Sequence, residues 1–363
     1  MNSISSTSTR PLRASTYYWK CDRPAAFHGT SGTHDHAFLA HAVKSIVESH
    51  FGAPAHIAPG PGQGNHVTFT AACGDLPLFI RIDDSPESDD YLAIESQVQE
   101  SVRTLGIRTP EILVVDASRA KVPFAWQIMR RIDAPDINRH FKDRTLDLRA
   151  ASEAIGSAIA SWQFLHPEGY GPFRSGQRQL KGWHANYSDY FFLHFERHLH
   201  FLQENDFLSH PEASAIRQEM LNHQALLDLP EGCLVHKDLA FWNILGTPDE
   251  ILAFIDWDDA ISGDPMDDFS LLACFHGATV LEPALGAYQM QRALPINHRR
   301  RFWLHLLRNM LVKSVIRVGA GYFDRGSGFF LINDGIDLKT FTRQRLHQAI
   351  AGLRDDLPIS SLK

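Results

Sequence analysis

The chain contains 363 residues, of which 44% are hydrophobic, so it can bury one large core or two modest ones. It has 35 basic and 42 acidic residues and a formal net charge of -7, without a basic stripe that could follow a phosphate backbone. We therefore expect a globular protein that does not bind nucleic acid.

The cysteines and the hydropathy pattern bear on the compartment. The four cysteines are far apart and have neither pairing nor metal-ligand spacing, which favours the reducing cytoplasm. The Ser- and Thr-rich start has no apolar stretch and no apolar run approaches membrane-spanning length, so we expect neither export nor a membrane partner. The 20 histidines are scattered outside any His-Glu-x-x-His frame, so no histidine metal site is predicted.

The first part of the chain predicts an extension and then a helix. Residues 1–34 are rich in serine, threonine and glycine around a short aromatic patch at residues 17–19, and they are expected to precede the folded body. From His36 onward, apolar residues recur with helical period until Gly52. We expect an opening helix there.

A predicted hairpin follows, and its bend is rich in glycine. Residues 60–65 read Gly-Pro-Gly-Gln-Gly-Asn and lie ahead of alternating apolar residues that begin at Val67. Because glycine lets backbone amides approach phosphate closely, the candidate nucleotide-binding residues are Gly62, Gly64 and Asn65. The alternative is a flexible loop, which is the commoner role of a glycine cluster.

Two further apolar runs complete a predicted five-stranded sheet, at residues 112–115 and 124–129. Residues 35–130 are expected to form a lobe built on this sheet, and residues 131–363 a second lobe. Helical periodicity dominates the second lobe and predicts helices over residues 148–166, 183–204, 211–226, 283–294, 296–318 and 338–353.

The strongest signal in the chain lies in residues 234–256. One apolar run ends near Asp238, and Asn243 follows five residues later, where a second apolar run begins. After a turn, a third apolar run is closed by Asp256. Phosphoryl transfer needs one carboxylate at the acceptor hydroxyl, and an amide oxygen with a second carboxylate to hold divalent metal. These three residues supply that set. The alternative is that they only form turns at strand ends.

The surrounding motif resembles a known family. The spacing His-x-Asp-x-x-x-x-Asn resembles the catalytic loop of the protein-kinase-like superfamily. Ile-Asp-Trp-Asp, Gly-Asp-Pro at residues 263–265 and then Asp268 resemble the aminoglycoside phosphotransferase family, with Asp258 where that family more often has Glu. The resemblance implies an α+β, bilobal protein-kinase-like fold, with an N-terminal lobe of a five-stranded antiparallel sheet with helices and a larger, mainly helical C-terminal lobe.

The resemblance also implies a reaction, in which the terminal phosphoryl group of ATP, or GTP, moves directly to a hydroxyl of a small molecule. Asp238 would orient that hydroxyl and accept its proton, while Asn243 and Asp256 would hold two Mg²⁺ ions. His236 would bond the backbone near the metal-binding turn, and Asp268 would brace the catalytic loop.

Arg81 ends a predicted strand at the position where kinases carry a lysine that pairs with the phosphates and with a helix glutamate. The helix predicted over residues 91–105 offers Glu95 and Glu100 as partners. We expect Glu95, because Glu100 lies too close to the helix-to-strand junction at residues 106–110. An exposed helix glutamate is the alternative.

The family's adenine-binding hinge falls at the crossover between the lobes. Nucleotide contacts are therefore expected near Gln127, Met129 and Arg130. Such contacts use main-chain donors and acceptors, which nearly every residue offers, so they leave no residue preference in the sequence.

The acceptor site is less specified. Residues 165–173, together with Trp183, resemble the insert from which small-molecule kinases of this family build an acceptor pocket. Aromatic side chains suit sugar rings and apolar metabolites, so Trp183 is a candidate substrate-binding residue, with helix core as the alternative. Asp258 belongs to an acidic run that could draw a cationic acceptor. The candidate acceptors are aminoglycoside-like molecules, sugars and amino alcohols.

Two basic features remain. Lys237 stands where the family commonly places glycine, and we expect an outward-facing, solvated side chain, with contact to the transferred phosphate as the alternative. Residues 298–301 form a dense basic run, which is expected to be the solvated first turn of a helix.

Three functions stay open at this point. A small-molecule kinase is favoured by the intact set Asp238, Asn243 and Asp256. A pseudokinase that binds a nucleotide or another ligand is the alternative, suggested by Arg81 and Lys237. A protein kinase is disfavoured, because no Ala-Pro-Glu segment follows the metal-binding motif. The sequence does not indicate an oligomeric state.

Overall fold

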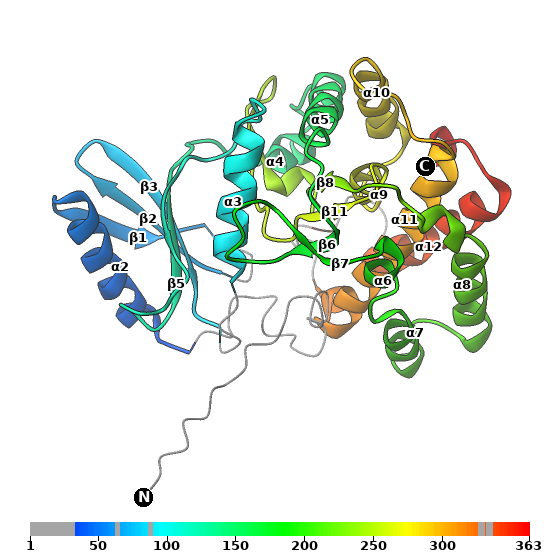
Figure 1. Ribbon diagram of the computed structural model, residues 1–363, viewed down its shortest axis with the longest axis horizontal. Coiled ribbons are helices and arrows are strands. Elements are labelled where there is room, and N and C mark those ends of the chain that lie inside the picture. The colour runs from blue at the N-terminus through cyan, green and yellow to red at the C-terminus, as the bar shows by residue number, and fades with distance from the viewer. Residues whose placement is uncertain (1–32, 62–65, 86–89, 326–330, 332–336) are drawn as a thin grey trace, which may run out of the picture.

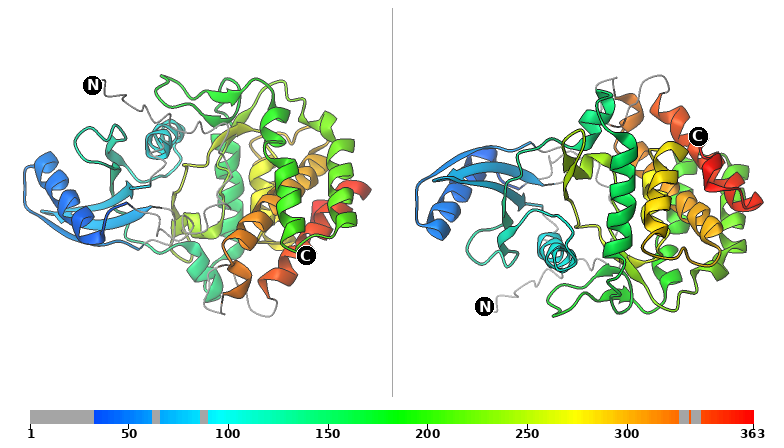
Figure 2. Two further views of the ribbon diagram at one scale, coloured as in Figure 1. Left: turned by 90° about the horizontal axis from the view of Figure 1, so that it is seen from below. Right: turned by 90° about the horizontal axis from the view of Figure 1, so that it is seen from above.

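The residues that the computed structural model describes are 33–61, 66–85, 90–325, 331 and 337–363. Most of the predicted extension lies outside the described residues, and so do the candidate nucleotide-binding residues Gly62, Gly64 and Asn65. The sheet and the larger helical part lie at opposite ends of the molecule (Figures 1 and 2).

The five strands of the predicted sheet are β1 (Ala55–Pro59), β2 (Val67–Cys73), β3 (Leu76–Asp83), β4 (Ile112–Asp116) and β5 (Ala125–Arg130). All neighbouring strands are antiparallel and pair in the order β1-β2-β3-β5-β4, which confirms the prediction. Because β5 lies between β3 and β4, its backbone groups are used on both edges of the strand.

The helix predicted to begin at His36 is α2 (His36–Phe51), which packs on β1 and β2. Asp35 caps its start by accepting a hydrogen bond from Phe38 N, and Gly52 ends it with a φ of 69°, a left-handed conformation that glycine adopts easily. On the other side of the sheet lies α3 (Tyr91–Arg103) (Figure 1). Apolar residues of α3 join the hydrophobic core of the helical part, so this helix links the sheet to that core.

The helices of the larger part are α4 (Ile137–Lys142), α5 (Leu148–Trp162), α6 (Tyr187–Phe191), α7 (Phe195–Glu204), α8 (His210–Asn222), α9 (Asp267–Ala273), α10 (Ala278–Gln289), α11 (His298–Gly319) and α12 (Leu338–Asp355). Its short strands are β6 (Tyr170–Phe173), β7 (Gly182–His184), β8 (Cys233–Val235), β9 (Ile244–Gly246), β10 (Ile251–Phe254) and β11 (Ile261–Gly263). They form a four-stranded sheet in the order β7-β6-β11-β8 and the pair β10-β9.

The helix predicted over residues 183–204 is wrong. That segment holds the end of β7, then α6 and α7, because the chain at Gly182 pairs with β6. A Cβ at Gly182 would lie 2.5 Å from Tyr170 N, so the two strands approach more closely than a side chain allows. Helix α9 was not predicted, because all of its residues are buried and such a segment has no amphipathic period.

The described residues include one long, largely buried helix and three buried free thiols. Helix α11 has 22 residues, yet no helix in the described ranges is both long and apolar enough to cross a membrane. Cys73, Cys233 and Cys274 are free and buried. Burial raises the pKa of the Cys274 thiol to about 11, so this thiol stays protonated and unreactive at neutral pH.

His276 provides a pH-dependent test of this core. Its ring stacks on Phe241 with 3.9 Å between ring centroids, and only 7% of the residue is exposed. Burial, with the nearby charge of Arg345, lowers the pKa of His276 to about 3. The folded chain therefore binds fewer protons here than the unfolded chain, and this contribution to stability is lost as the pH falls below about 6.5.

When the pH is lowered from about 7.5 to about 5, the free energy of unfolding of His276→Phe should rise relative to that of the native chain by about 2 kcal/mol. Urea unfolding of both proteins at the two pH values measures this difference. The exposed His41, changed to Phe, is the control and should show no such gain. A stability difference for His276→Phe that does not depend on pH would contradict a neutral buried ring.

Candidate active site

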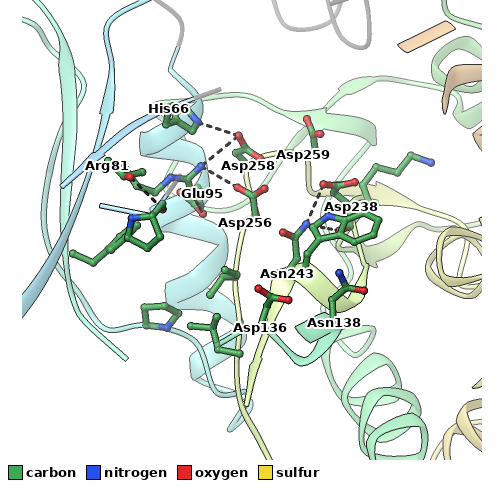
Figure 3. A pocket seen from close by; sticks show the side chains of 18 of the residues that line it. His66, Arg81, Glu95, Asp136, Asn138, Asp238, Asn243, Asp256, Asp258 and Asp259 are labelled. Carbon is green, nitrogen blue, oxygen red and sulfur yellow. Dashed lines mark hydrogen bonds and ion pairs between the residues drawn. The ribbon is translucent and has the colours of Figure 1, made fainter. Parts of the chain in front are cut away.

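The side chains of Asp238, Asn243 and Asp256 line one cavity of about 740 Å³ between the sheet and the helical part (Figure 3). Asn243 Nδ2 donates hydrogen bonds to the main-chain oxygen of Asp238 at 2.8 Å and to Asp238 Oδ2 at 3.0 Å. These bonds use the side-chain nitrogen of Asn243. Its side-chain oxygen, which can only accept, is therefore left to bind a cation.

Asp256 follows the strand pair β9-β10 in a left-handed conformation with a φ of 67°. Its neighbour Ile255 donates a main-chain hydrogen bond to Asn243 O at 3.0 Å, which ties the two segments together. Burial and the nearby charge of Asp258 raise the pKa of Asp256 to about 7. A divalent cation at this carboxylate would favour its charged form.

The donor set decides which metal the site could hold. Carboxylate and amide oxygens suit Mg²⁺, which usually takes one or two protein carboxylates and completes its shell with water and substrate phosphates. Within the part of the chain that is described, no three His, Cys, Asp or Glu side chains converge on a point that could hold a metal. Asn243 and Asp256 thus fit magnesium that arrives with phosphate groups, and they do not fit a zinc site.

The predicted ion pair between Arg81 and Glu95 is confirmed. Arg81 Nη1 lies 2.5 Å from Glu95 Oε1, and its Nη2 lies 2.9 Å from Asp256 Oδ1. Burial alone would lower the pKa of Arg81, but the charges of Glu95, Asp256 and Asp258 outweigh it and raise that pKa. Glu95 is fully buried whereas Glu100, on the same helix, is exposed.

We expect Glu95→Gln to weaken binding of magnesium nucleotide roughly tenfold to hundredfold, the effect of losing a charged hydrogen bond. The reason is that Arg81 would lose the carboxylate that fixes its guanidinium at the back of the cavity. Calorimetry with the non-hydrolysable nucleotide AMP-PNP measures the effect. Glu100→Gln is the matched control, and equal affinities for the two variants would show that the ion pair does not position Arg81.

The two predicted support residues lie behind the catalytic loop. His236 Nε2 contacts the main-chain oxygen of Ile255 at 3.0 Å, and because a carbonyl only accepts, this nitrogen carries the proton. Burial lowers the pKa of His236 to about 4, so the ring is neutral. Asp268 accepts main-chain hydrogen bonds from His236 at 3.2 Å and Lys237 at 3.3 Å, and one from Trp162 Nε1 at 2.9 Å.

The expectation of a solvated Lys237 is wrong. Its side chain is fully buried, with Nζ at 2.7 Å from Asp267 Oδ2 and 2.8 Å from Asn309 Oδ1. Burial lowers the pKa of Lys237 to about 8. The sequence could not reveal this, because α9 and α11 bring the two partners to the back of the loop. The residue also has a φ of 68°, a conformation that suits the glycine commonly found here in the resembling family.

Of the three expected hinge residues, only Met129 and Arg130 line the cavity. Gln127 was also expected to contact the nucleotide, but it is not among the residues that line the cavity. It lies inside β5 opposite Arg81 on one neighbouring strand and Val115 on the other, so its backbone groups are already paired. Its side chain is fully buried and donates to Ser96 Oγ at 2.8 Å.

The two candidate substrate-binding residues lie apart. Trp183 is in β7, where the guanidinium of Arg174 stacks 4.7 Å from its ring centroid, and it is not among the residues that line the cavity. Asp258 does line the cavity, but its Oδ2 lies 3.3 Å from His66 Nε2 and 3.9 Å from Arg81 Nη2. Asp258 therefore belongs to the Arg81 side of the cavity (Figure 3).

Sequence reasoning missed the contribution of α11. Polar side chains recur every four residues along it, so each lies next to the following one on the helix surface. Lys313 Nζ contacts Asp238 Oδ1 at 2.8 Å. The recurrence of a polar residue at every fourth position was the available signal, and the residues that share it are Arg301, His305, Asn309, Lys313 and Arg317.

Comparisons with known proteins agree with this arrangement. The chain is similar to the solved structure of aminoglycoside phosphotransferase APH(4)-Ia, with a TM-score of 0.60 and 18% identity, covering 88% of this chain and 100% of that one. It is also similar to a choline/ethanolamine kinase family protein from Mesorhizobium loti, with a TM-score of 0.56 and 18% identity, covering 90% of this chain and 96% of that one. These neighbours confirm the predicted protein-kinase-like fold.

No curated protein has a sequence that matches this chain significantly. Residues 58–303, which are more than half of the chain, match the phosphotransferase enzyme family (APH). The chain therefore belongs to the phosphotransferase enzyme family.

Proposed function

We propose that this phosphotransferase transfers the terminal phosphoryl group of ATP to a hydroxyl of a small molecule. The observation that carries the proposal is the set formed by Asp238, Asn243 and Asp256 around one cavity, with the Arg81–Glu95 ion pair at its back. Residues 35–130 would hold the nucleotide and residues 131–363 the acceptor. The buried thiols agree with a reducing, cytoplasmic location.

The reaction assigns a task to each side chain. Asp238 would hold the acceptor hydroxyl and take its proton as the oxygen attacks the terminal phosphorus. The bond from that phosphorus to the bridging oxygen breaks, and its electron pair leaves with ADP. Asn243 and Asp256 would hold magnesium, which offsets negative charge on the phosphate oxygens when bound. Arg81 would contact the phosphates of the nucleotide.

Structural neighbours support the choice of ligands. A thermostable mutant of APH(4)-Ia, with a TM-score of 0.59 and 17% identity to this chain, has been solved in a ternary complex with ADP and hygromycin B. Another has been solved with AMP-PNP and hygromycin B. A nucleotide and a hydroxyl-bearing small molecule thus occupy proteins of the same fold.

Nucleotide binding is the first test. Calorimetry with ATP and with GTP, each with magnesium in excess, should show binding of ATP, and removal of magnesium by a chelator should weaken it. A panel of aminoglycosides, sugars and amino alcohols should then be assayed for ADP release. If neither nucleotide binds with magnesium present, the kinase assignment fails and a ligand-binding pseudokinase takes its place.

A further inference from the structure

The cavity extends past Asp238 along α11, and this end has a distinct composition. Its walls are largely apolar and include the aromatic side chains of Phe275 and Tyr322. The remaining apolar residues that line this end are Leu271, Val312, Ile316 and Leu331. A compound whose hydroxyl reaches Asp238 would therefore place its body against apolar and aromatic side chains.

Arg317 lines this end of the cavity and is only 1% exposed. Its Nη1 donates to Thr342 Oγ1 at 2.7 Å, while Nε and Nη2 are buried without a hydrogen-bond partner. Among the described residues, no carboxylate forms an ion pair with Arg317. A buried guanidinium without a counter-charge is costly, because burial removes the water that would solvate it.

Lys313 and Arg317 lie on the same face of α11, one turn apart, so their Cα atoms are about 6 Å apart along the helix axis. Both cations lie over the ring of Phe275, with Lys313 Nζ at 5.4 Å and Arg317 Cζ at 5.7 Å from its centroid. Lys313 is held at Asp238 by its 2.8 Å ion pair. Lys313 thus lies where the acceptor hydroxyl would react, and Arg317 lies one helical turn farther along α11.

Three carboxylates that line the cavity have partners away from Arg317. Asp256 and Asp258 face Arg81, and Asp136 caps α4 by accepting a hydrogen bond from Arg139 N. Asp259 is the remaining acid near Asp238, on the side of Asp258 (Figure 3). The end beyond Lys313 therefore presents the guanidinium of Arg317 together with apolar surface.

We propose that the acceptor is an anionic alcohol: a molecule with an apolar or aromatic body, a hydroxyl that reaches Asp238, and a carboxylate or phosphate that binds Arg317. This inference rests on the proposed kinase function and names the class of its acceptor. It differs from the cationic acceptor that the acidic run at residues 256–268 suggested. A polycationic aminoglycoside would place like charges against Lys313 and Arg317, which is unfavourable in a buried site.

The test uses three probes with one skeleton and different charge: para-hydroxymethylbenzoate, its neutral amide, and the cationic para-hydroxymethylbenzylamine. Each is added to the full-length chain with saturating AMP-PNP and magnesium, and thermal unfolding and calorimetry report binding. We expect the carboxylate to bind at least roughly tenfold more tightly than the amide, the effect of one charged hydrogen bond, and the amine not to bind. ADP release with ATP in place of AMP-PNP then compares turnover of the same three alcohols.

Two variants test whether Arg317 is the cation that binds the carboxylate of the probe. Arg317→Met should weaken binding of the carboxylate roughly tenfold to hundredfold and leave the amide and AMP-PNP unchanged. Arg345→Met is the matched control, because Arg345 is also buried with unpartnered nitrogens but lines a different cavity on α12. Arg317→Met should fold, since it removes a buried charge that has no ion-pair partner among the described residues.

Each outcome decides the proposal. Failure of the carboxylate to bind, equal or better binding of the amide or amine, or the same effect from Arg317→Met and Arg345→Met would overturn it. The comparison of three probes on the native chain decides the charge preference without any variant. Failure of the kinase function itself gives a different result, because AMP-PNP alone would then not stabilise the chain.

Discussion

Replacing Asp238 with asparagine should lower turnover by about a hundredfold or more, the usual contribution of a positioned base, and leave nucleotide affinity nearly unchanged. The carboxylate lies between Lys313 and Asn243, on the side of the cavity away from Arg81 (Figure 3). Burial alone would raise the pKa of Asp238, but the charge and hydrogen bond of Lys313 lower it. The side chain is therefore charged and ready to accept a proton at neutral pH.

Asp256→Asn is the matched comparison and should behave differently. It removes the carboxylate proposed to hold magnesium, so magnesium-dependent nucleotide binding and turnover should fall together. Calorimetry gives the affinities and ADP release gives the rates, measured side by side for the two variants. If Asp238→Asn abolishes nucleotide binding while Asp256→Asn spares it, the two roles have been assigned the wrong way round.

Lys237→Met should lower the free energy of unfolding by roughly 3–5 kcal/mol, as expected when one partner of a buried ion pair is removed. Both Lys237 and Asp267 have fully buried side chains, and the carboxylate of Asp267 would be left with Asn309, Ser270 and the more distant His305. Lysine and methionine are both unbranched, so the left-handed backbone at this position is strained to a similar degree in each. Urea unfolding followed by circular dichroism measures the change.

A double variant separates the lost charge from the lost packing. Adding Asp267→Asn to Lys237→Met removes the uncompensated carboxylate, so the double variant should recover part of the lost stability. A cost below about 1 kcal/mol for Lys237→Met alone would be typical of an exposed ion pair and would contradict the buried arrangement. The main-chain N–H of Lys237 donates to Asp268, and this bond does not involve the side chain that is changed.

The sequence by itself determined the sheet and the core of the site. The five strands have local alternation, and the spacing of Asp238, Asn243 and Asp256 is fixed by short strands with turns between them, so nearby residues carry the whole signal. Glu95 was also identified correctly as the partner of Arg81, because a strand and the helix that follows it set that contact.

Only the tertiary structure decided the rest, because the partners are far apart in the chain. Lys237 meets Asp267 across 30 residues, and Lys313 meets Asp238 across 75 residues. Whether Lys237 is solvated or paired depends on where α9 and α11 pack, and the period of α11 shows which residues share a face but not what that face contacts. The packing of the side chain of Gln127 against Ser96 likewise depends on where α3 lies on the sheet, and it leaves Gln127 outside the residues that line the cavity.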